Sequence, residues 1–243
     1  LRRLSNGKPV GFKLCLGKRR EFIALCKAMV ETGTTPDFIT IDGGEGGTGA
    51  APVEFSNSVG CPLREALVFI QNCLVGFSLR DRIKIIVSGK VTMGFDLIAK
   101  LAIGADICNS ARGMMMSLGC IQALRCNSNT CPVGIATSDP ELVAGLNIED
   151  KGQRVANYHH ETIKVVGEML SAMGLTHTSQ LRPWHLMRRT EANQIKHYGE
   201  IFEYLKPGDL LKEHLPKSFS RAFSGASSST FASVADDSEK IAS

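Results

Sequence analysis

Three closely spaced cysteines have the clearest potential for chemistry in this chain. Cys120, Cys126 and Cys131 are separated by five and four residues, and Pro132 follows the last of them. Thiolates in a short run that ends in Cys-Pro are typical iron–sulfur ligands, and three of them without a fourth nearby suit a cluster of three irons. Zinc sites more often use paired Cys-x2-Cys steps. The alternative is three unrelated buried thiols, because free cysteine also packs as a small apolar side chain.

A glycine-rich segment is a second candidate for ligand binding. Residues 42–52 read Asp-Gly-Gly-Glu-Gly-Gly-Thr-Gly-Ala-Ala-Pro and follow a short apolar run. Glycines let the backbone approach a ligand closely and aim N–H groups at it. The segment matches neither a P-loop nor a dinucleotide-binding G-x-G-x-x-G. Its candidate contacts are Gly46, Gly47 and Thr48, and the competing interpretation is a mobile turn.

Apolar runs alternate with helical patterns and would position these segments. The runs predict strands at 9–15, 38–41, 83–87 and 106–109. Helical spacing and end signals predict helices at 19–32, 95–103 and 111–124, and a further helix that opens at Pro62. Four successive strand–helix units imply an α/β fold with a parallel sheet and helices outside it.

The spacing of the units suits a (β/α)8 TIM barrel, which has eight units in about 250 residues. Four units are half of such a barrel, the C-terminal half if these strands are its last four, and a half barrel leaves an apolar face and two sheet edges uncovered. Either the first half lies upstream of Leu1, or the sheet is open and doubly wound.

Two short loops follow the third and fourth expected strands. They read Ser88-Gly89-Lys90 and Ser110-Ala111-Arg112-Gly113. Barrels commonly bind phosphate in the loops after strands seven and eight, which these strands would be. The expected phosphate donors are the Ser110 hydroxyl and the backbone N–H groups of Gly89, Ala111 and Arg112. The competing interpretation makes Arg112 a surface ion-pair residue.

Lys13 lies in the middle of the first expected strand, between Phe12 and Leu14. Successive strand residues point to opposite faces, so Lys13 points into the barrel or its mouth if its neighbours point outward. A buried lysine is costly unless it is paired, which makes an anionic ligand a natural partner. An exposed position on a sheet edge is the alternative.

The remaining segments carry weaker signals. Residues 133–146 predict a loop, 151–173 a long amphipathic helix and 181–211 a short helical appendix. From Pro216 on, Ser and Ala replace large apolar residues, which predicts a disordered tail. The expected division is a half barrel with the cysteine run at 1–135, a helical extension packed on it at 136–215, and the tail at 216–243.

The composition is that of a soluble globular protein. Of 243 residues, 43% are hydrophobic and 21% charged, and the net charge of +4 is too small to indicate nucleic-acid binding. No apolar stretch reaches the length of a membrane span, and the first residues lack the apolar core of a signal peptide. The other five cysteines lie mostly in apolar segments and are expected to stay reduced, which favours a cytoplasmic location.

These motifs together resemble the FMN-binding domain of the glutamate synthase family. The resemblance runs in order over about residues 8–175 and is greatest to short, stand-alone members. It is carried by the strand at 10–14, the Gly-Gly-Thr-Gly-Ala-x-Pro loop at 46–52, Leu-Arg-Asp-Arg at 79–82, and the cysteine run at 119–140.

The resemblance implies a barrel with FMN at its carboxyl mouth and a 3Fe–4S cluster beside it. Cys120, Cys126 and Cys131 match the cluster ligands, and Gly89 matches a phosphate-binding glycine. Ala111 and Arg112 fall where the family has Gly-Ser at the phosphate. Lys13 matches a lysine near the flavin, where its charge would stabilise the reduced, anionic ring, and it is the candidate catalytic residue.

The chain departs from the family pattern in two loops. It has Val87-Ser88-Gly89-Lys90 where the large enzymes have Ala-Asp-Gly-Gly, and Glu45 where they have Asp. The first half of the barrel, which helps to hold 2-oxoglutarate, and the glutaminase domain have no counterpart in these residues. The resemblance therefore does not imply glutamine hydrolysis.

The implied function is that of an oxidoreductase acting on CH-NH2 donors in glutamate biosynthesis. Electrons from ferredoxin or an NAD(P)H-linked subunit would pass through the cluster and FMN to an imino acid such as 2-iminoglutarate. Two alternatives are another FMN-dependent barrel oxidoreductase, of the 2-hydroxyacid oxidase type, and a zinc-stabilised interaction module that adds His159 or His160 to the cysteines. The N-terminal half of the barrel is an expected partner, and a third alternative is that the chain alone is inactive and does not fold.

Overall fold

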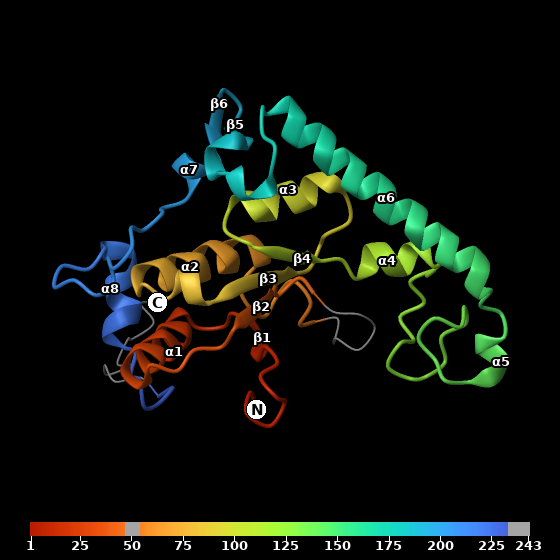
Figure 1. Ribbon diagram of the computed structural model, residues 1–243, viewed down its shortest axis with the longest axis horizontal. Helices are drawn as coiled ribbons and strands as arrows, with labels where there is room; N and C mark the ends of the chain where they lie inside the picture. Colours follow the sequence, from red (N-terminus) through yellow and green to blue (C-terminus); the bar gives the residue numbers. More distant parts are fainter. Residues whose placement is uncertain (47–53, 233–243) are drawn as a thin grey trace.

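A four-stranded parallel sheet is the centre of the computed structural model, which describes residues 1–46 and 54–232 (Figure 1). The strands are β1 (Gly11–Cys15), β2 (Phe38–Asp42), β3 (Lys84–Ser88) and β4 (Ile107–Asn109). They pair in the order β1-β2-β3-β4, without the reversal of order that marks a doubly wound sheet. This order and direction confirm the α/β fold and are those of half a (β/α)8 barrel.

Three helices cover one face of the sheet. They are α1 (Arg19–Thr32), α2 (Leu63–Gly76) and α3 (Gly94–Ala102). Each crossover moves one strand further in the same direction, and because crossovers are right-handed this puts all three helices on one side. Ile39 and Ile41 of β2 and Ile85 and Val87 of β3 point into this layer and are fully buried.

The opposite face of the sheet would be the interior of a closed barrel. Lys13, Thr40, Ile86 and Ile107 are register partners on this face, which we call the open face. Ile107 remains 49% exposed there. Two residues further along the strands, a second row lies at their carboxyl ends, which we call the rim row: Cys15, Asp42, Ser88 and Asn109.

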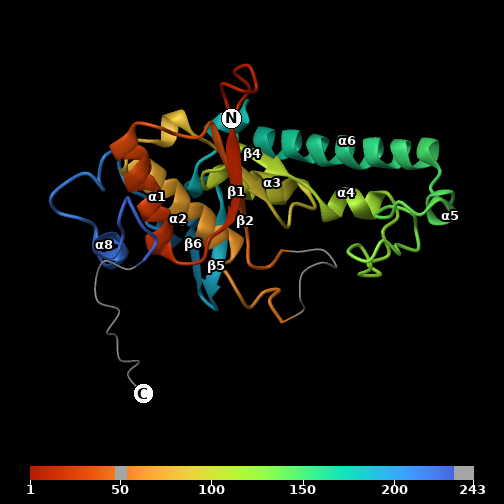
Figure 2. The ribbon, with the colours of Figure 1, turned by 90° about the horizontal axis from the view of Figure 1, so that it is seen from below.

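A long helix extends from the sheet beyond the cysteine run. The helix α4 (Arg112–Ser117) follows β4, and α5 (Pro140–Val143) and α6 (Ile148–Ala172) follow the cysteines. Asn147 caps α6, because its side-chain oxygen accepts the Asp150 N–H at 3.0 Å. Figures 1 and 2 both show α6 lying alongside α3 and α4.

The helix predicted at 111–124 is shorter than expected. It ends at Ser117, and Gly119 then takes a φ of 101°. Gln122 and Leu124 also have positive φ, at 56° and 55°, so this backbone cannot continue a right-handed helix. The loop predicted at 133–146 contains the single turn α5, which Asp139 caps by accepting the Glu141 N–H.

The helical appendix predicted at 181–211 is wrong for its central part. That part is an antiparallel hairpin of β5 (Met187–Glu191) and β6 (Gln194–His197), followed by the one-turn helix α7 (Tyr198–Ile201). The structure also has 3-10 turns at Arg80–Arg82, Thr178–Gln180 and Pro183–His185, and the last of these lies within the predicted appendix. Every residue of β5 is exposed, so this strand lacks the apolar alternation that distinguishes a strand from a polar helix in a sequence.

The expected disordered tail begins instead with an ordered helix, α8 (Lys217–Ser224). Phe219 is buried and stacks on Phe69 of α2 with 5.4 Å between ring centroids, and Phe223 stacks on Phe77 at 5.8 Å. Residues 233–243 lie outside the described part of the chain. In the described ranges, no helix combines the length and the apolar character that crossing a membrane requires.

Candidate functional site

Lys13 and Asp42 form an ion pair at the carboxyl end of the sheet. The Lys13 Nζ lies 2.6 Å from Asp42 Oδ2, and the lysine side chain is 57% exposed. The lysine thus lies on the open face, on the side that strand alternation favoured if its neighbours point outward. Its charge already has a protein partner, so a bound anion is not needed to offset it.

Asp42 is also where two loops approach each other. Its Oδ1 accepts the Gly43 N–H at 3.0 Å. A Cβ on Gly46 would lie 3.0 Å from this same oxygen, and a Cβ on Gly89 would lie 3.3 Å from it. Gly89 also has a φ of 140°, which side chains rarely tolerate. Both glycines therefore let their loops pass close to the carboxylate.

The loop after β2 is held to its neighbours through Glu45, one of the two departures from the family pattern. Its carboxylate accepts the Leu63 N–H at the first turn of α2, at 3.2 and 3.0 Å. Its backbone oxygen accepts the Arg112 guanidinium at 3.5 Å. Arg112 thereby reaches from the loop after β4 to the loop after β2. Gly47 and Thr48, two of the candidate contacts, lie outside the described residues.

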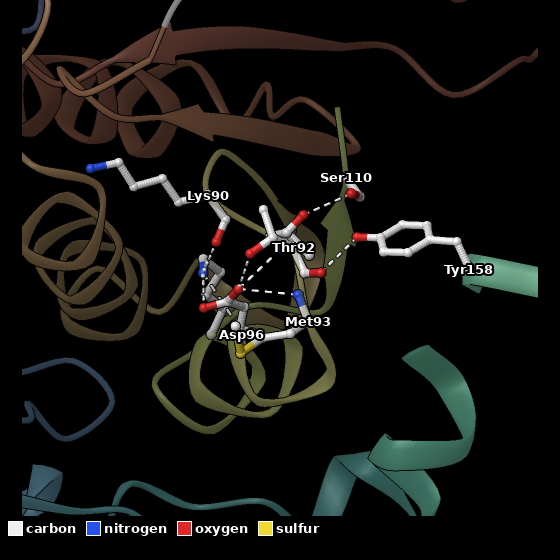
Figure 3. A network of polar contacts seen from close by, with 8 residues as sticks. Lys90, Thr92, Met93, Asp96, Ser110 and Tyr158 are labelled. Atoms are coloured by element: carbon white, nitrogen blue, oxygen red, sulfur yellow. Dashed lines mark hydrogen bonds and ion pairs between the residues drawn. The ribbon is translucent and has the colours of Figure 1, made fainter. Parts of the chain in front are cut away.

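The loop after β3 is fixed by a polar network (Figure 3). Asp96 Oδ2 accepts the backbone N–H groups of Thr92 and Met93 and the Thr92 hydroxyl, at 3.0, 3.2 and 2.9 Å. Lys100 donates to the Lys90 carbonyl at 2.9 Å. Burial lowers the pKa of Lys100, an effect that the nearby Asp96 carboxylate partly offsets. The network holds this loop in one conformation, in which Lys90 has a φ of 46°.

The predicted phosphate donors lie in these loops, and some of them already have a hydrogen-bond partner in the protein whereas others are exposed. The Ser110 hydroxyl donates to the Val91 carbonyl at 2.7 Å, so its proton joins the two loops to each other. Ala111 and Arg112 are exposed at the start of α4, and the Lys90 side chain extends away from the network into solvent. Ser88 lies in the rim row between Asp42 and Asn109.

The three cysteines line one hollow beside α4. Its empty volume is about 650 Å³ with open solvent included, and Arg112 lines it too. Cys131 is buried, and backbone N–H groups, chiefly of Ala136 and Val133, lower the pKa of its thiol. The Cys120 sulfur accepts the Gln122 N–H at 3.4 Å. A thiolate at Cys131 thus has ready-made stabilisation, as a metal ligand requires.

The hollow fits an iron–sulfur cluster in donor chemistry but is not a preformed metal site. Within residues 1–46 and 54–232, no group of three His, Cys, Asp or Glu side chains is arranged to hold a metal ion. His159 and His160, which a zinc site would have added, line a separate depression on the exposed side of α6. The structure therefore does not bring these histidines into the cysteine hollow.

Sequence reasoning missed Asp42, Asp96 and Tyr158. Asp42 follows an apolar strand directly, and Asp96 stands three residues after the N-cap of α3, a position typical of capping acids. Both signals were available in the sequence. Tyr158 gave none, because its hydrogen bond to the Thr92 carbonyl joins residues far apart in the chain.

Comparison with known proteins places this chain in a family. A family model described as the conserved region in glutamate synthase matches residues 1–176. The chain belongs to this family. It is 43% identical over 188 residues to the glutamate synthase large subunit-like protein YerD of Bacillus subtilis, covering 77% of this chain and 36% of that protein.

An archaeal glutamate synthase [NADPH] of Methanocaldococcus jannaschii is 36% identical over 175 residues, covering 72% of this chain and 34% of that protein. This glutamate synthase family member thus spans about a third of the length of the curated relatives it matches. Among solved structures, a flavocytochrome b2 mutant with pyruvate bound matches with a TM-score of 0.43 and 17% identity, covering 75% of this chain and 36% of that one.

Proposed function

We propose that this chain forms the FMN-binding and cluster-binding half of a glutamate synthase-like oxidoreductase. The observation that carries the proposal is the arrangement at the carboxyl ends of the strands. There the loops after β2 and β3 approach Asp42, and the loop after β4 leads through α4 to the hollow lined by the three cysteines. Ligand sites of parallel α/β folds lie at this end of the sheet.

FMN would bind across this end of the sheet, and when bound it supplies hydride transfer. The proposed phosphate contacts are the backbone N–H groups of Gly89, Ala111 and Arg112, with Ser88, Lys90 and Ser110 beside them. The proposed contacts of the glycine-rich loop are Gly46, Gly47 and Thr48. Glycine at 46 and 89 lets both loops lie against the Asp42 carboxylate, so the two sets of proposed contacts are close to each other.

Lys13 would set the charge beside the flavin ring. Its ammonium group is held at the rim by Asp42, and the exposed position leaves further donors free to reach a ligand. A cation in this place stabilises negative charge that develops on the cofactor or on a bound imino acid. The Asp42 carboxylate orients the lysine through their ion pair.

Cys120, Cys126 and Cys131 would bind a 3Fe–4S cluster, which supplies one-electron transfer. The N–H groups around Cys131 favour the thiolate that iron requires. Arg112 lines the same hollow and bonds to the loop after β2, so it would lie between the two cofactors.

The proposed substrate is an imino acid, 2-iminoglutarate, formed from 2-oxoglutarate and ammonia. Relatives are named as NADPH-dependent and, in Arabidopsis thaliana, as ferredoxin-dependent, which supports either kind of electron donor. We further propose that the N-terminal half of a barrel covers the open face, and that the protein acts in the cytoplasm.

Flavin retention and turnover test this function together. The chain is purified anaerobically together with the proposed N-terminal half of the barrel, titrated with FMN, and supplied with 2-oxoglutarate, ammonium and reduced ferredoxin or NADPH. We expect FMN binding and FMN-dependent glutamate formation. A protein that binds FMN but oxidises 2-hydroxy acids would favour the other class of FMN barrel. A protein that binds no flavin would contradict the proposal.

A further inference from the structure

A tyrosine on α6 reaches the loop after β3. The Tyr158 hydroxyl donates to the Thr92 carbonyl at 2.7 Å, and its half-buried ring lies beside the polar network of that loop (Figure 3). Thr92 is in turn bound to Asp96 through both its N–H and its hydroxyl. The tyrosine therefore contacts a loop that is already ordered and joins it to the long helix.

The same tyrosine occupies a notch at the start of α4. A Cβ on Gly113 would overlap the Tyr158 hydroxyl and lie 2.9 Å from the Ser110 Oγ. Ser110 bonds to Val91 of the neighbouring loop. The Tyr158 hydroxyl thus sits between residues 88–93 and residues 110–113, and the missing side chain of Gly113 makes room for it.

A second glycine lets α6 pack closely at the start of α3. A Cβ on Gly94 would lie 2.8 Å from Val165 Cγ1 and 3.1 Å from the Thr162 carbonyl. Thr162 donates its hydroxyl to the Tyr158 carbonyl at 2.7 Å. Hence α6 abuts the first residues of both helices that follow the two loops.

We propose that Tyr158 is a positioning residue that sets the spacing of the loops after β3 and β4, and thereby the affinity for a phosphate ester. Its hydroxyl fixes the loop after β3 relative to α6, while its ring fixes the start of α4. The identity of the ligand as FMN rests on the proposed function, whereas the positioning of the loops does not.

Comparing the affinities for FMN and riboflavin separates a positioning role of Tyr158 from a general packing role. Riboflavin carries the same ring and ribityl chain as FMN but lacks the phosphate. Displaced loops would weaken only the phosphate contacts, so the affinity for FMN should fall while that for riboflavin stays. Loss of packing by α6 would instead lower the melting temperature and weaken both flavins alike.

The test uses Tyr158→Phe, which removes the hydroxyl and keeps the ring. Its matched control is Tyr204→Phe, because the Tyr204 hydroxyl is buried and has no hydrogen-bond partner among the described residues. Dissociation constants for FMN and riboflavin are measured by flavin fluorescence. We expect the FMN preference of Tyr158→Phe to fall about fivefold, the effect of one neutral hydrogen bond, with the control unchanged.

Amide hydrogen exchange of the ligand-free protein gives a readout that does not depend on flavin. Tyr158→Phe should lose protection in residues 88–93, and Gly113→Ala should do the same because its methyl displaces the tyrosine. The two changes should be non-additive in the double variant, since they act on one contact.

The outcomes are distinguishable. Unchanged FMN preference together with unchanged exchange in Tyr158→Phe overturns the role of Tyr158. Equal losses for both flavins also overturn it. A wild-type protein that binds neither flavin contradicts the proposed function and the phosphate part of the inference, and hydrogen exchange still decides whether Tyr158 positions the loops.

Discussion

At the residue scale, the candidate site is organised around Asp42. This carboxylate pairs with Lys13 and lies against Gly46 and Gly89, so one side chain connects β1 with the loops after β2 and β3. The ion pair is partly exposed, and pairs of this kind contribute at most about 1 kcal/mol to stability. Its importance is therefore expected in ligand binding and turnover, not in folding.

Replacing Lys13 tests whether the ion pair serves ligand binding and turnover and not folding. Lys13→Met should change the free energy of unfolding by less than about 1 kcal/mol. Because the cation would no longer stabilise developing negative charge, FMN-dependent turnover should fall about 100-fold. Steady-state rates and urea unfolding measure the two effects. Lys164→Met, at an exposed ion pair on α6, is the control. Turnover at the wild-type rate in Lys13→Met would exclude a catalytic role.

The partly buried thiol of Cys108 is expected to lower the free energy of unfolding at alkaline pH. Burial raises the pKa of Cys108 from 9.0 to about 11, with a smaller opposing effect of Lys100. Below pH 9 the thiol is neutral in both folded and unfolded chains. Between pH 9 and 11 only the unfolded chain ionises, so the folded state loses the stability that the raised pKa had contributed, roughly 2 kcal/mol.

Unfolding by urea at pH 8 and pH 10.5 measures this loss. We expect Cys108→Ala to lose less stability between the two values than the wild type does. Other buried thiols, such as Cys73, also have a raised pKa, so the Cys108→Ala variant should still lose some stability at pH 10.5. An identical loss in both proteins would show that Cys108 does not titrate in this way.

The site could be predicted from sequence only in part at this scale. The face of Lys13 followed from strand alternation, and the grouping of the cysteines followed from their short separation. The ion pair of Lys13, the bond of Ser110 to Val91 and the reach of Tyr158 could not be predicted. Each joins residues from different elements, whose distances depend on the packed fold and not on local pattern.

At the scale of elements, the sequence predicted the sheet and its three covering helices but not the helix α8. The strands and α1 to α3 were predicted well, because apolar periodicity is a local signal. The helix α8 was missed because its segment is rich in serine and its apolar partners, Phe69 and Phe77, belong to another region of the chain. Lys27 of α1 also binds it, donating to the carbonyls of Phe223 and Ala226 at 2.8 Å each.

The docking of α8 should contribute measurably to stability. Phe219→Ala removes a buried, stacked ring and should lower the free energy of unfolding by about 3 kcal/mol. Phe231→Ala is the matched control, because that ring is 56% exposed, and it should cost less than about 0.5 kcal/mol. Equal, small effects of both changes in urea unfolding would mean that α8 does not pack on α2 in solution.

At the scale of the whole molecule, the sheet has one covered face and one open face. The covered face carries the hydrophobic core, whereas the open face carries Lys13, Thr40, Ile86 and the half-exposed Ile107. The rim row lies at the same end of the sheet as the loops, and Arg112 at the start of α4 lines the cysteine hollow. The central proposal about this protein is that FMN and an iron–sulfur cluster bind at these two places and exchange electrons.

Iron content together with bound flavin tests that claim most directly. Metal analysis and visible spectra are taken from the anaerobically purified wild type, Cys131→Ser, and the control Cys108→Ser. We expect about three irons per chain and bound FMN in the wild type and the control, and loss of iron from Cys131→Ser. Zinc in place of iron, or iron that Cys131→Ser retains in full, would contradict the claim.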